Sequence, residues 1–219
     1  MKRTIDKTLI LTTLVCLSPI AISLLFYDKL PERIPIHFNL AGEADNYASK
    51  NFAAFALPSL FALGNILLQV IMNNDPKKAA GQPLRTISKW ILPIVSLLII
   101  SMPLVLSGGH AAKLDRIGHI AIALVFLVVG NYLPKCKQNY VVGIKLPWTL
   151  ASEENWNRTH RFAGWLWSAA SILLLISALG GWYVSLVFPL SIASMLLGPV
   201  LYSFRLYKTA GGENLTDRP

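Results

Sequence analysis

The feature that most constrains this chain is a series of apolar segments, each long enough to cross a lipid bilayer. A crossing takes about 20 residues of helix, and the sequence offers six such segments, at residues 8–27, 52–72, 87–107, 117–133, 162–179 and 182–203. The chain is 54% hydrophobic and 14% charged, whereas soluble domains carry about 25% charged residues. The sequence therefore predicts an all-α, polytopic integral membrane protein with six transmembrane helices.

The first apolar segment follows Met1, Lys2 and Arg3, as the apolar part of a signal peptide would. Its apolar stretch is long, however, and no cleavage site with small residues follows it. We therefore expect this segment to be retained as the first transmembrane helix.

The 20 Lys and Arg residues are distributed unevenly among the segments that connect the spans. If the N-terminus is cytoplasmic, the outer segments contain only five of them: Lys29, Arg33, Lys50, Lys113 and Arg116. Because cytoplasmic loops carry an excess of Lys and Arg, both termini are predicted to be cytoplasmic. The net charge of +9 is then explained by topology and by contact with anionic lipid. Direct binding of nucleic acid is not expected, since the sequence has no motif for it.

We expect four consecutive parts along the chain. Residues 1–75 contain the first two spans and an outer loop, and residues 76–134 contain the middle two spans. Residues 135–207 contain a cytoplasmic loop and the last two spans, and residues 208–219 form a flexible cytoplasmic tail. The same order of spans would also suit two inverted units of three helices, a pattern found in transporters.

The outer loop, residues 27–51, is predicted to form a short extended segment over the ends of the helices. Ile34–Phe38 has the apolar content of a strand, and residues 39–42 have the composition of a turn. One histidine with nearby carboxylates lacks the ligand number of a zinc site, so a hydrogen-bonded turn is favoured over a metal site. An extended segment could also accept a strand from a peptide ligand. The candidate ligand contacts are His37, Asn39, Gly42, Glu43 and Asp45.

The cytoplasmic loop changes character at Ser152. An extended stretch precedes it, and Ser152 followed by two glutamates predicts a capped helix start that runs into the fifth span. Glu153, Asn157 and His160 are predicted to share one helical face, and Glu154 with Arg158 an ion pair. The candidate partner-binding residues of this region are Asn139, Gly143, Lys145, Pro147, Trp148, Glu153, Trp156, Asn157, His160 and Arg161.

Two interpretations of that helix start remain open. It is either a polar helix end anchored by tryptophans at the membrane surface, or a face that binds a protein partner or changes conformation. A histidine near a carboxylate can also act as a general base, but no nucleophile accompanies His160. We expect His160 at the membrane boundary, outside the packed interior, and therefore expect His160→Ala to fold.

Both loops resemble known sequence patterns. The stretch "NYVVGIKLPWTLASEENWNRTHRFAG" is similar to the signature of the SdpI family of bacterial membrane immunity proteins, and "LPERIPIHFNLAGEADNYASK" is similar to a small domain of unknown function that often precedes it. The resemblance implies a polytopic membrane protein that protects its bearer against a secreted toxic peptide. For the best-known member it also implies a signal that sequesters a repressor at the membrane.

This chain departs from the family pattern where Lys145 and Leu146 replace Arg-Thr. A bidentate guanidinium is thereby exchanged for a point charge, and a hydroxyl is lost. The departure bears on the binding of a repressor more than on the fold.

The expected partners are thus the lipid bilayer, a secreted peptide outside and a soluble repressor inside, with no cofactor, no metal and no enzymatic activity. A small secondary transporter or exporter is the alternative, and a membrane-embedded enzyme the second alternative. Uptake into vesicles would identify a transporter, and a chemical turnover that requires His160 would identify an enzyme.

Overall fold

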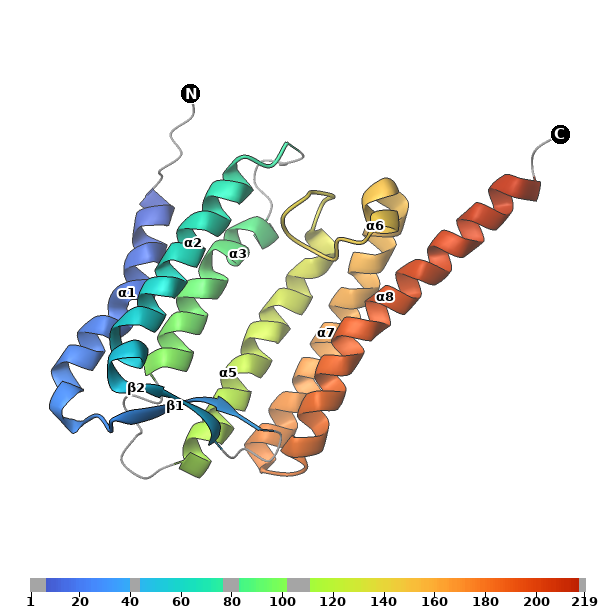
Figure 1. Cartoon of the computed structure of the whole chain (residues 1–219). Coiled ribbons are helices and arrows are strands. Elements are labelled where there is room, and N and C mark those ends of the chain that lie inside the picture. Colours follow the sequence, from blue (N-terminus) through green and yellow to red (C-terminus); the bar gives the residue numbers. More distant parts are fainter. Residues whose placement is uncertain (1–6, 40–43, 77–82, 102–110, 217–219) are drawn as a thin grey trace.

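The structure, a computed structural model, describes residues 7–39, 44–76, 83–101 and 111–216 and consists mainly of long helices that run side by side (Figure 1). The long helices are α1 (Lys7–Phe26), α2 (Leu57–Asn73), α3 (Pro83–Val95), α5 (Ala111–Tyr132), α7 (Glu153–Gly180) and α8 (Val184–Thr216). Shorter helical segments are η1 (Tyr27–Lys29), η2 (Phe52–Ala56), η3 (Ser96–Ile100), η4 (Leu133–Lys135) and α6 (Pro147–Ala151). Of these, η2 and η3 are π-helical turns.

Five helices in the described part of the chain are long and apolar enough to cross a membrane: Lys7–Lys29, Phe52–Asn73, Arg116–Lys135, Glu153–Gly180 and Val184–Ala210. They confirm the first, second, fourth, fifth and sixth predicted spans. The third predicted span, residues 87–107, coincides with α3 and η3, and its residues 102–107 lie outside the described residues. The protein is therefore a multi-pass membrane protein.

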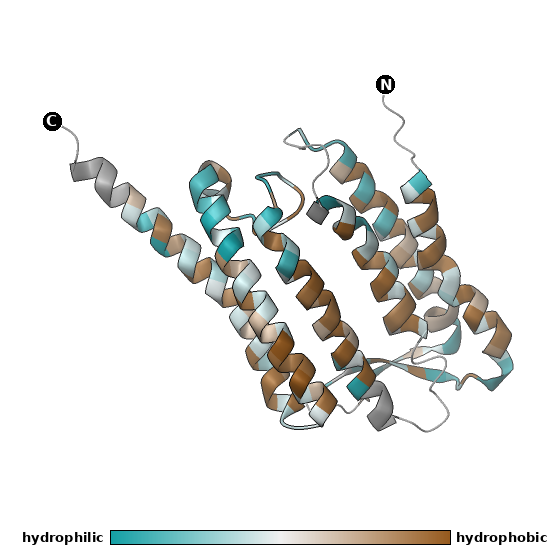
Figure 2. Ribbon diagram, turned by 180° about the vertical axis from the view of Figure 1, so that it is seen from behind, coloured by the Kyte–Doolittle hydropathy of each residue, from teal (hydrophilic) through white to brown (hydrophobic). Residues whose placement is uncertain are grey.

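The outward faces of these helices are apolar. Figure 2 shows hydrophobic residues along the middle of the helices and hydrophilic residues at their ends. Large leucines such as Leu14, Leu25, Leu63, Leu186 and Leu201 are more than half exposed on the bundle. In water such a surface would drive aggregation, so it indicates contact with lipid acyl chains.

The helices form two groups of three. Helices α1, α2 and α3 contact one another, α7 packs against both α5 and α8, and α3 contacts α5 between the groups. The α5–α7 crossing is close because it is built on glycines: a Cβ added to Gly164 would lie 2.5 Å from the Pro134 ring and 2.8 Å from the Gly130 carbonyl oxygen. Small residues at such crossings let transmembrane helices approach closely.

The outer loop forms an antiparallel hairpin of β1 (Arg33–Phe38) and β2 (Ala44–Ser49). The predicted strand at Ile34–Phe38 is confirmed, whereas the second strand was not predicted. The pairing is irregular on both sides of His37. Of the predicted turn, residues 40–43 lie outside the described residues.

The hairpin lies at one end of the helical bundle, and the loop before α7, the start of α1 and the end of α8 lie at the other (Figure 1). The two loops singled out in the sequence are therefore far apart in space. Any functional link between them has to run along the helices.

Candidate functional site

The loop between η4 and α6, residues 136–146, is held together by the side chain of Asn139. We call these residues the signature loop. The Asn139 Oδ1 atom accepts hydrogen bonds from the backbone N–H groups of Val141 and Val142, at 2.9 and 2.7 Å. Its Nδ2 group donates to the carbonyl oxygens of Lys137 and Val142, both at 2.9 Å. One buried amide thus replaces the hydrogen bonds that a helix or sheet would supply, and it keeps the loop compact.

The signature loop is fixed to α7 by His160 and Trp156, both fully buried. The His160 Nε2 atom accepts the backbone N–H of Ile144 at 3.0 Å, and Nδ1 donates to the Trp156 carbonyl oxygen at 2.8 Å. This arrangement requires the neutral Nδ1–H tautomer. The two rings stack with centroids 4.0 Å apart, and Trp156 Nε1 donates to the Cys136 carbonyl oxygen at 2.7 Å.

Gly143 is required by this packing. Its φ of +117° lies in a region that L side chains rarely adopt. A Cβ at this position would lie 2.5 Å from His160 Nε2 and 3.0 Å from the Trp156 ring. The histidine, the tryptophan and the glycine therefore form one structural unit.

Thr149, also fully buried, closes the loop on its other side. Its Oγ1 atom donates to the Ile144 carbonyl oxygen at 2.8 Å and accepts the Leu146 N–H at 2.9 Å, which caps the short helix α6. Gln138 Nε2 donates to the carbonyl oxygens of Thr149 and Leu150, both at 3.0 Å. The loop and α6 thus form one hydrogen-bonded body.

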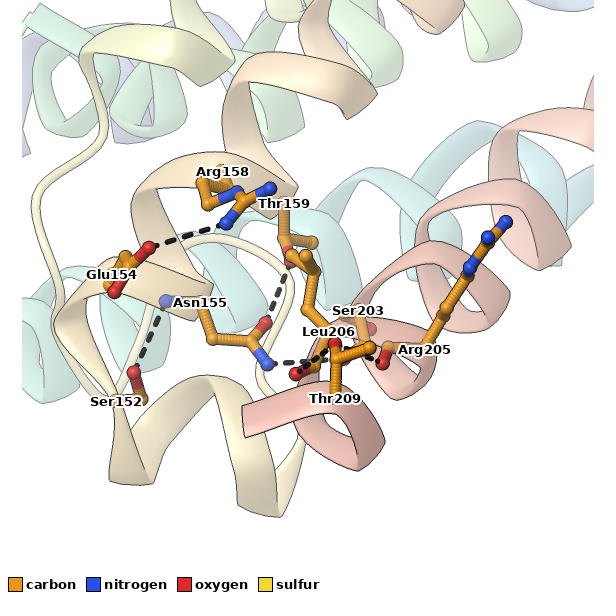
Figure 3. A network of polar contacts seen from close by, with 9 residues as sticks. All are labelled: Ser152, Glu154, Asn155, Arg158, Thr159, Ser203, Arg205, Leu206 and Thr209. Atoms are coloured by element: carbon orange, nitrogen blue, oxygen red, sulfur yellow. Dashed lines mark hydrogen bonds and ion pairs between the residues drawn. The ribbon is translucent and has the colours of Figure 1, made fainter. Parts of the chain in front are cut away.

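A second polar network joins α7 to α8 (Figure 3), and α6 contacts α8 beside it. Thr159 Oγ1 donates to Asn155 Oδ1 at 3.0 Å, and Asn155 Nδ2 donates to the Ser203 carbonyl oxygen at 3.0 Å. From α6, Trp148 Nε1 donates to Ser203 Oγ at 3.0 Å. Trp148 also packs against the rings of Phe204 and Tyr207. The end of α8 is therefore fixed relative to the signature loop.

Cys136 lies inside the signature loop, where its thiol is buried. Its Sγ atom lies 3.5 Å from the Val142 carbonyl oxygen and 3.6 Å from Asn139 Nδ2. Burial raises the pKa of the Cys136 thiol to about 11, although the contact with Asn139 acts in the opposite direction. The reactive thiolate is therefore scarce at neutral pH, and alkylation of this thiol requires the loop to open.

The structure separates the predicted partner-binding residues into two sets. Asn139, Trp156 and His160 are buried and Gly143 is packed against them, so these four hold the loop together. This corrects the expectation that His160 lies outside the packed interior: the loop covers it completely. The exposed set comprises Lys145, Pro147, Glu153, Asn157 and Arg161, with Trp148 half-buried beside them.

Two local predictions for the start of α7 are confirmed. Ser152 Oγ accepts the Asn155 N–H at 3.2 Å and caps the helix. Arg158 and Glu154 form an ion pair at 3.3 Å. The predicted common face of Glu153, Asn157 and His160 is divided by burial, because the signature loop covers His160 and leaves the other two exposed.

In the hairpin, the structure brings two of the predicted outer residues together. His37 Nδ1 lies 2.6 Å from Asp45 Oδ1, and these side chains are 65% and 43% exposed. Asn39 follows β1 and is half-buried, whereas Gly42 and Glu43 lie outside the described residues. Within the described ranges, no three His, Cys, Asp or Glu side chains come close enough to hold a metal ion.

The residues that connect the loops to the rest of the bundle were not predicted from the sequence. No sequence pattern indicates the hydrogen-bond partners of Thr149, Asn155 and Ser203. Asp75, which is 4% exposed, accepts the Tyr140 N–H on its Oδ2 at 3.1 Å. The available signal was its position directly before Pro76 and between two spans, which indicates a residue just after the end of a helix near the membrane surface.

Comparison with known proteins agrees with this geometry. Residues 135–203 match the model of the SdpI/YfhL protein family, and residues 14–62 match a domain of unknown function, DUF1648. The signature loop, α6 and α7 fall in the first match, and the hairpin falls in the second.

Among curated proteins, the chain is similar to "Immunity protein SdpI" of Bacillus subtilis (strain 168). The two are 26% identical over 207 residues, which cover 94% of this chain and 98% of the relative. No solved structure matches. The chain thus has a region that matches DUF1648 followed by a region that matches the SdpI/YfhL protein family.

Proposed function

We propose that this protein gives its bearer resistance to a secreted toxic peptide. The observation that carries the proposal is the extent of the similarity to an immunity protein, which runs over 94% of this chain and 98% of the relative. Both loops and the spans between them are included, so the likeness is not confined to a common membrane-spanning segment.

The orientation that we propose places the hairpin outside the cell. With the termini and the signature loop in the cytoplasm, the positive charges follow the distribution typical of bacterial membrane proteins. The hairpin then meets the peptide first. It offers the exposed pair His37 and Asp45, and beside it Ile36 and Tyr47, which are 38% and 45% exposed. Such a mixed apolar and polar surface suits the binding of a peptide.

The protection that we propose is stoichiometric binding, in which the peptide is not consumed. The described hairpin residues combine apolar side chains with one imidazole, one carboxylate and the exposed guanidinium of Arg33, a set that binds through hydrogen bonds, charge and apolar contact. The peptide is held at the outer surface, and its access to the bilayer is thereby reduced.

A signalling role is the second part of the proposal. The exposed set at the cytoplasmic end, with Lys145, Glu153, Asn157 and Arg161, offers charges of both signs on a backbone that Asn139 and His160 hold rigid. A soluble partner such as a repressor would bind there, since preorganised surfaces lose little entropy on binding. The lysine at position 145 forms single charge contacts where a guanidinium would form paired ones.

The proposal is tested by expressing the chain in a bacterium that is sensitive to a panel of secreted toxic peptides and lacks its own immunity gene. We expect higher survival against one of these peptides, and recovery of that peptide intact by mass spectrometry. The variant His37→Ala/Asn39→Ala is expected to lose protection at unchanged membrane abundance.

The matched control is Asn131→Ala, an exposed asparagine at the opposite end of the bundle, which should protect as well as the wild type. Equal killing of expressing and non-expressing cells by the whole panel would refute the immunity function. Full protection by the double variant would refute only the hairpin as the contact site.

A further inference from the structure

The helix α2 runs from the hairpin to Asp75, the residue that contacts the signature loop. It begins without a loop after the hairpin, because residues 50 and 51 are already helical and lead through η2 into α2. It ends at Asn73, two residues before Asp75. The helical stretch from Phe52 to Asn73 has 22 residues, which at 1.5 Å per residue spans about 33 Å.

At the hairpin end, β1 is packed directly on the start of this helix. Ile34 of β1 is 1% exposed and forms an apolar cluster with Leu30, Ala53 of η2 and Ile100 of η3. The backbone N–H of Lys50 donates to the Glu32 carbonyl oxygen at 3.0 Å. A displacement of the hairpin therefore moves the start of α2 or breaks these contacts.

In the middle of the bundle, α2 is fixed to α1 by buried polar side chains. Asn65 Nδ2 and Gln69 Nε2 both donate to Thr12 Oγ1, at 3.1 and 2.7 Å, and all three residues are fully buried. Sliding or rotation of α2 against α1 would leave these groups without partners in an apolar environment, which is costly. The two helices are thus expected to move as one body.

At the other end, the chain after α2 is held in place by local contacts. The Asn74 N–H donates to the Val70 carbonyl oxygen at 3.1 Å. Arg85 of α3 donates to the Met72 carbonyl oxygen, and also to Asn73 Oδ1 at 3.4 Å. Asp75 is therefore positioned by the helix end itself, and a movement of α2 is passed on to it.

Asp75 in turn contacts the signature loop beside its central residue. Its Oδ2 atom accepts the Tyr140 N–H at 3.1 Å, one residue after Asn139. This hydrogen bond joins residues 65 positions apart in the sequence. It connects the segment that follows the DUF1648 match, residues 14–62, to the SdpI match, residues 135–203.

We propose that Asp75 is a positioning residue that holds the signature loop closed, and that α2 transmits a displacement of the hairpin to this contact. A peptide that displaces the hairpin would then weaken the Asp75–Tyr140 contact and change the conformation of the loop that a cytoplasmic partner meets. This use of the contact rests on the proposed function, but the contact and its coupling to the hairpin can be tested without any toxin.

The test uses Cys136 as the reporter, in the full-length protein with Cys16→Ala so that it carries one thiol. Purified membranes are treated with a small maleimide, and the rate of alkylation is followed by mass spectrometry. Asp75→Ala is expected to accelerate alkylation about tenfold, equivalent to about 1.4 kcal/mol in the opening equilibrium. The matched control Ile71→Ala, at a 48% exposed position one turn earlier in α2, should stay within about twofold of the parent.

Asp75→Asn distinguishes positioning from a loss of charge alone. Its amide oxygen can still accept the Tyr140 N–H, so it should restore most of the slow alkylation that Asp75→Ala loses. Equal rates for the parent, Asp75→Ala and Ile71→Ala would refute the role of Asp75.

The coupling is tested at the hairpin end with Ile34→Ala, and with the milder Ile34→Val if the first variant does not accumulate. Ile34→Ala should accelerate Cys136 alkylation, whereas Ile36→Ala, at an exposed position of the same strand, should not. In the background of Asp75→Ala, Ile34→Ala should add nothing, because the contact through which it acts is already lost. Transmission by α2 would be refuted if the double variant were alkylated at a rate increased by the product of the two single effects. It would also be refuted if neither Ile34→Ala nor Ile34→Val changed the rate. Neither result depends on protection against a toxin.

Discussion

Replacement of Gly143 by alanine is expected to open the signature loop. The substitution places a Cβ on a residue whose φ is +117°, 2.5 Å from His160 Nε2 and 3.0 Å from the Trp156 ring. Neither ring can move away without losing a hydrogen bond, since both are buried and each bonds to the backbone of the signature loop. His160 accepts the Ile144 N–H, and Trp156 donates to the Cys136 carbonyl oxygen.

The magnitude follows from three contributions. Backbone strain in the left-handed region costs about 1 to 3 kcal/mol, and forced overpacking costs about 1 to 3 kcal/mol. Displacement of His160 breaks its bond to the Ile144 N–H, which is worth about 1 kcal/mol. We therefore expect a loss of about 3 to 5 kcal/mol, allowing for partial relaxation.

The matched control is Gly181→Ala. Gly181 also has a positive φ, +74°, but a Cβ there would meet nothing within 4 Å. This variant should lose only the strain, about 1 to 2 kcal/mol. The difference between the two variants isolates the contact with His160 and Trp156.

Thermal unfolding in detergent and alkylation of Cys136 give the two measurements. For a chain of this size, about 1 kcal/mol lowers Tm by roughly 2 to 4 °C, so Gly143→Ala should lower it by about 10 °C and Gly181→Ala by less than half of that. Gly143→Ala should also speed the alkylation of Cys136, and Gly181→Ala should not. Equal effects of the two variants on Tm and on alkylation would refute the packing argument.

Two further predictions follow from the orientation and from the α6–α8 contact. Single cysteines introduced as Asn39→Cys and Asn157→Cys, in a chain without Cys16 and Cys136, should be labelled by an impermeant reagent from opposite sides of the membrane, with position 39 outside; labelling from one side would contradict this topology. Trp148→Phe should lower the free energy of unfolding by at least about 1 kcal/mol, because the Nε1 bond to Ser203 Oγ is lost and the phenyl ring fills less space than the indole; a Tm identical to that of the wild type would show that these contacts are not stabilising.

The sequence predicted the elements whose causes are local. The spans follow from long apolar runs, because exposure of apolar side chains to water is unfavourable wherever they lie along the chain. The cap at Ser152 and the Glu154–Arg158 pair depend on residues within one turn, and the structure has both. The extended segment Ile34–Phe38 was also found, since its own side chains favour a strand.

The second strand of the hairpin could not be predicted in this way. Its sequence, "ADNYAS", is mostly polar and has low strand propensity. It becomes a strand because β1 lies beside it and pairs with its backbone. The stabilising partner is thus another segment of the chain, and periodicity within the strand itself carries no sign of it.

The sequence by itself determined that this chain crosses the membrane repeatedly and which two loops carry the polar residues of interest. Only the tertiary structure decided what those residues do. It buries Asn139 inside the signature loop and His160 beneath this loop, and it leaves Asn157 exposed about one turn from His160. It also brings Asp75 to Tyr140 across 65 positions of sequence. The physical reason is that apolarity and capping act within a few residues, whereas burial and hydrogen bonding in an apolar interior depend on which distant segments pack together.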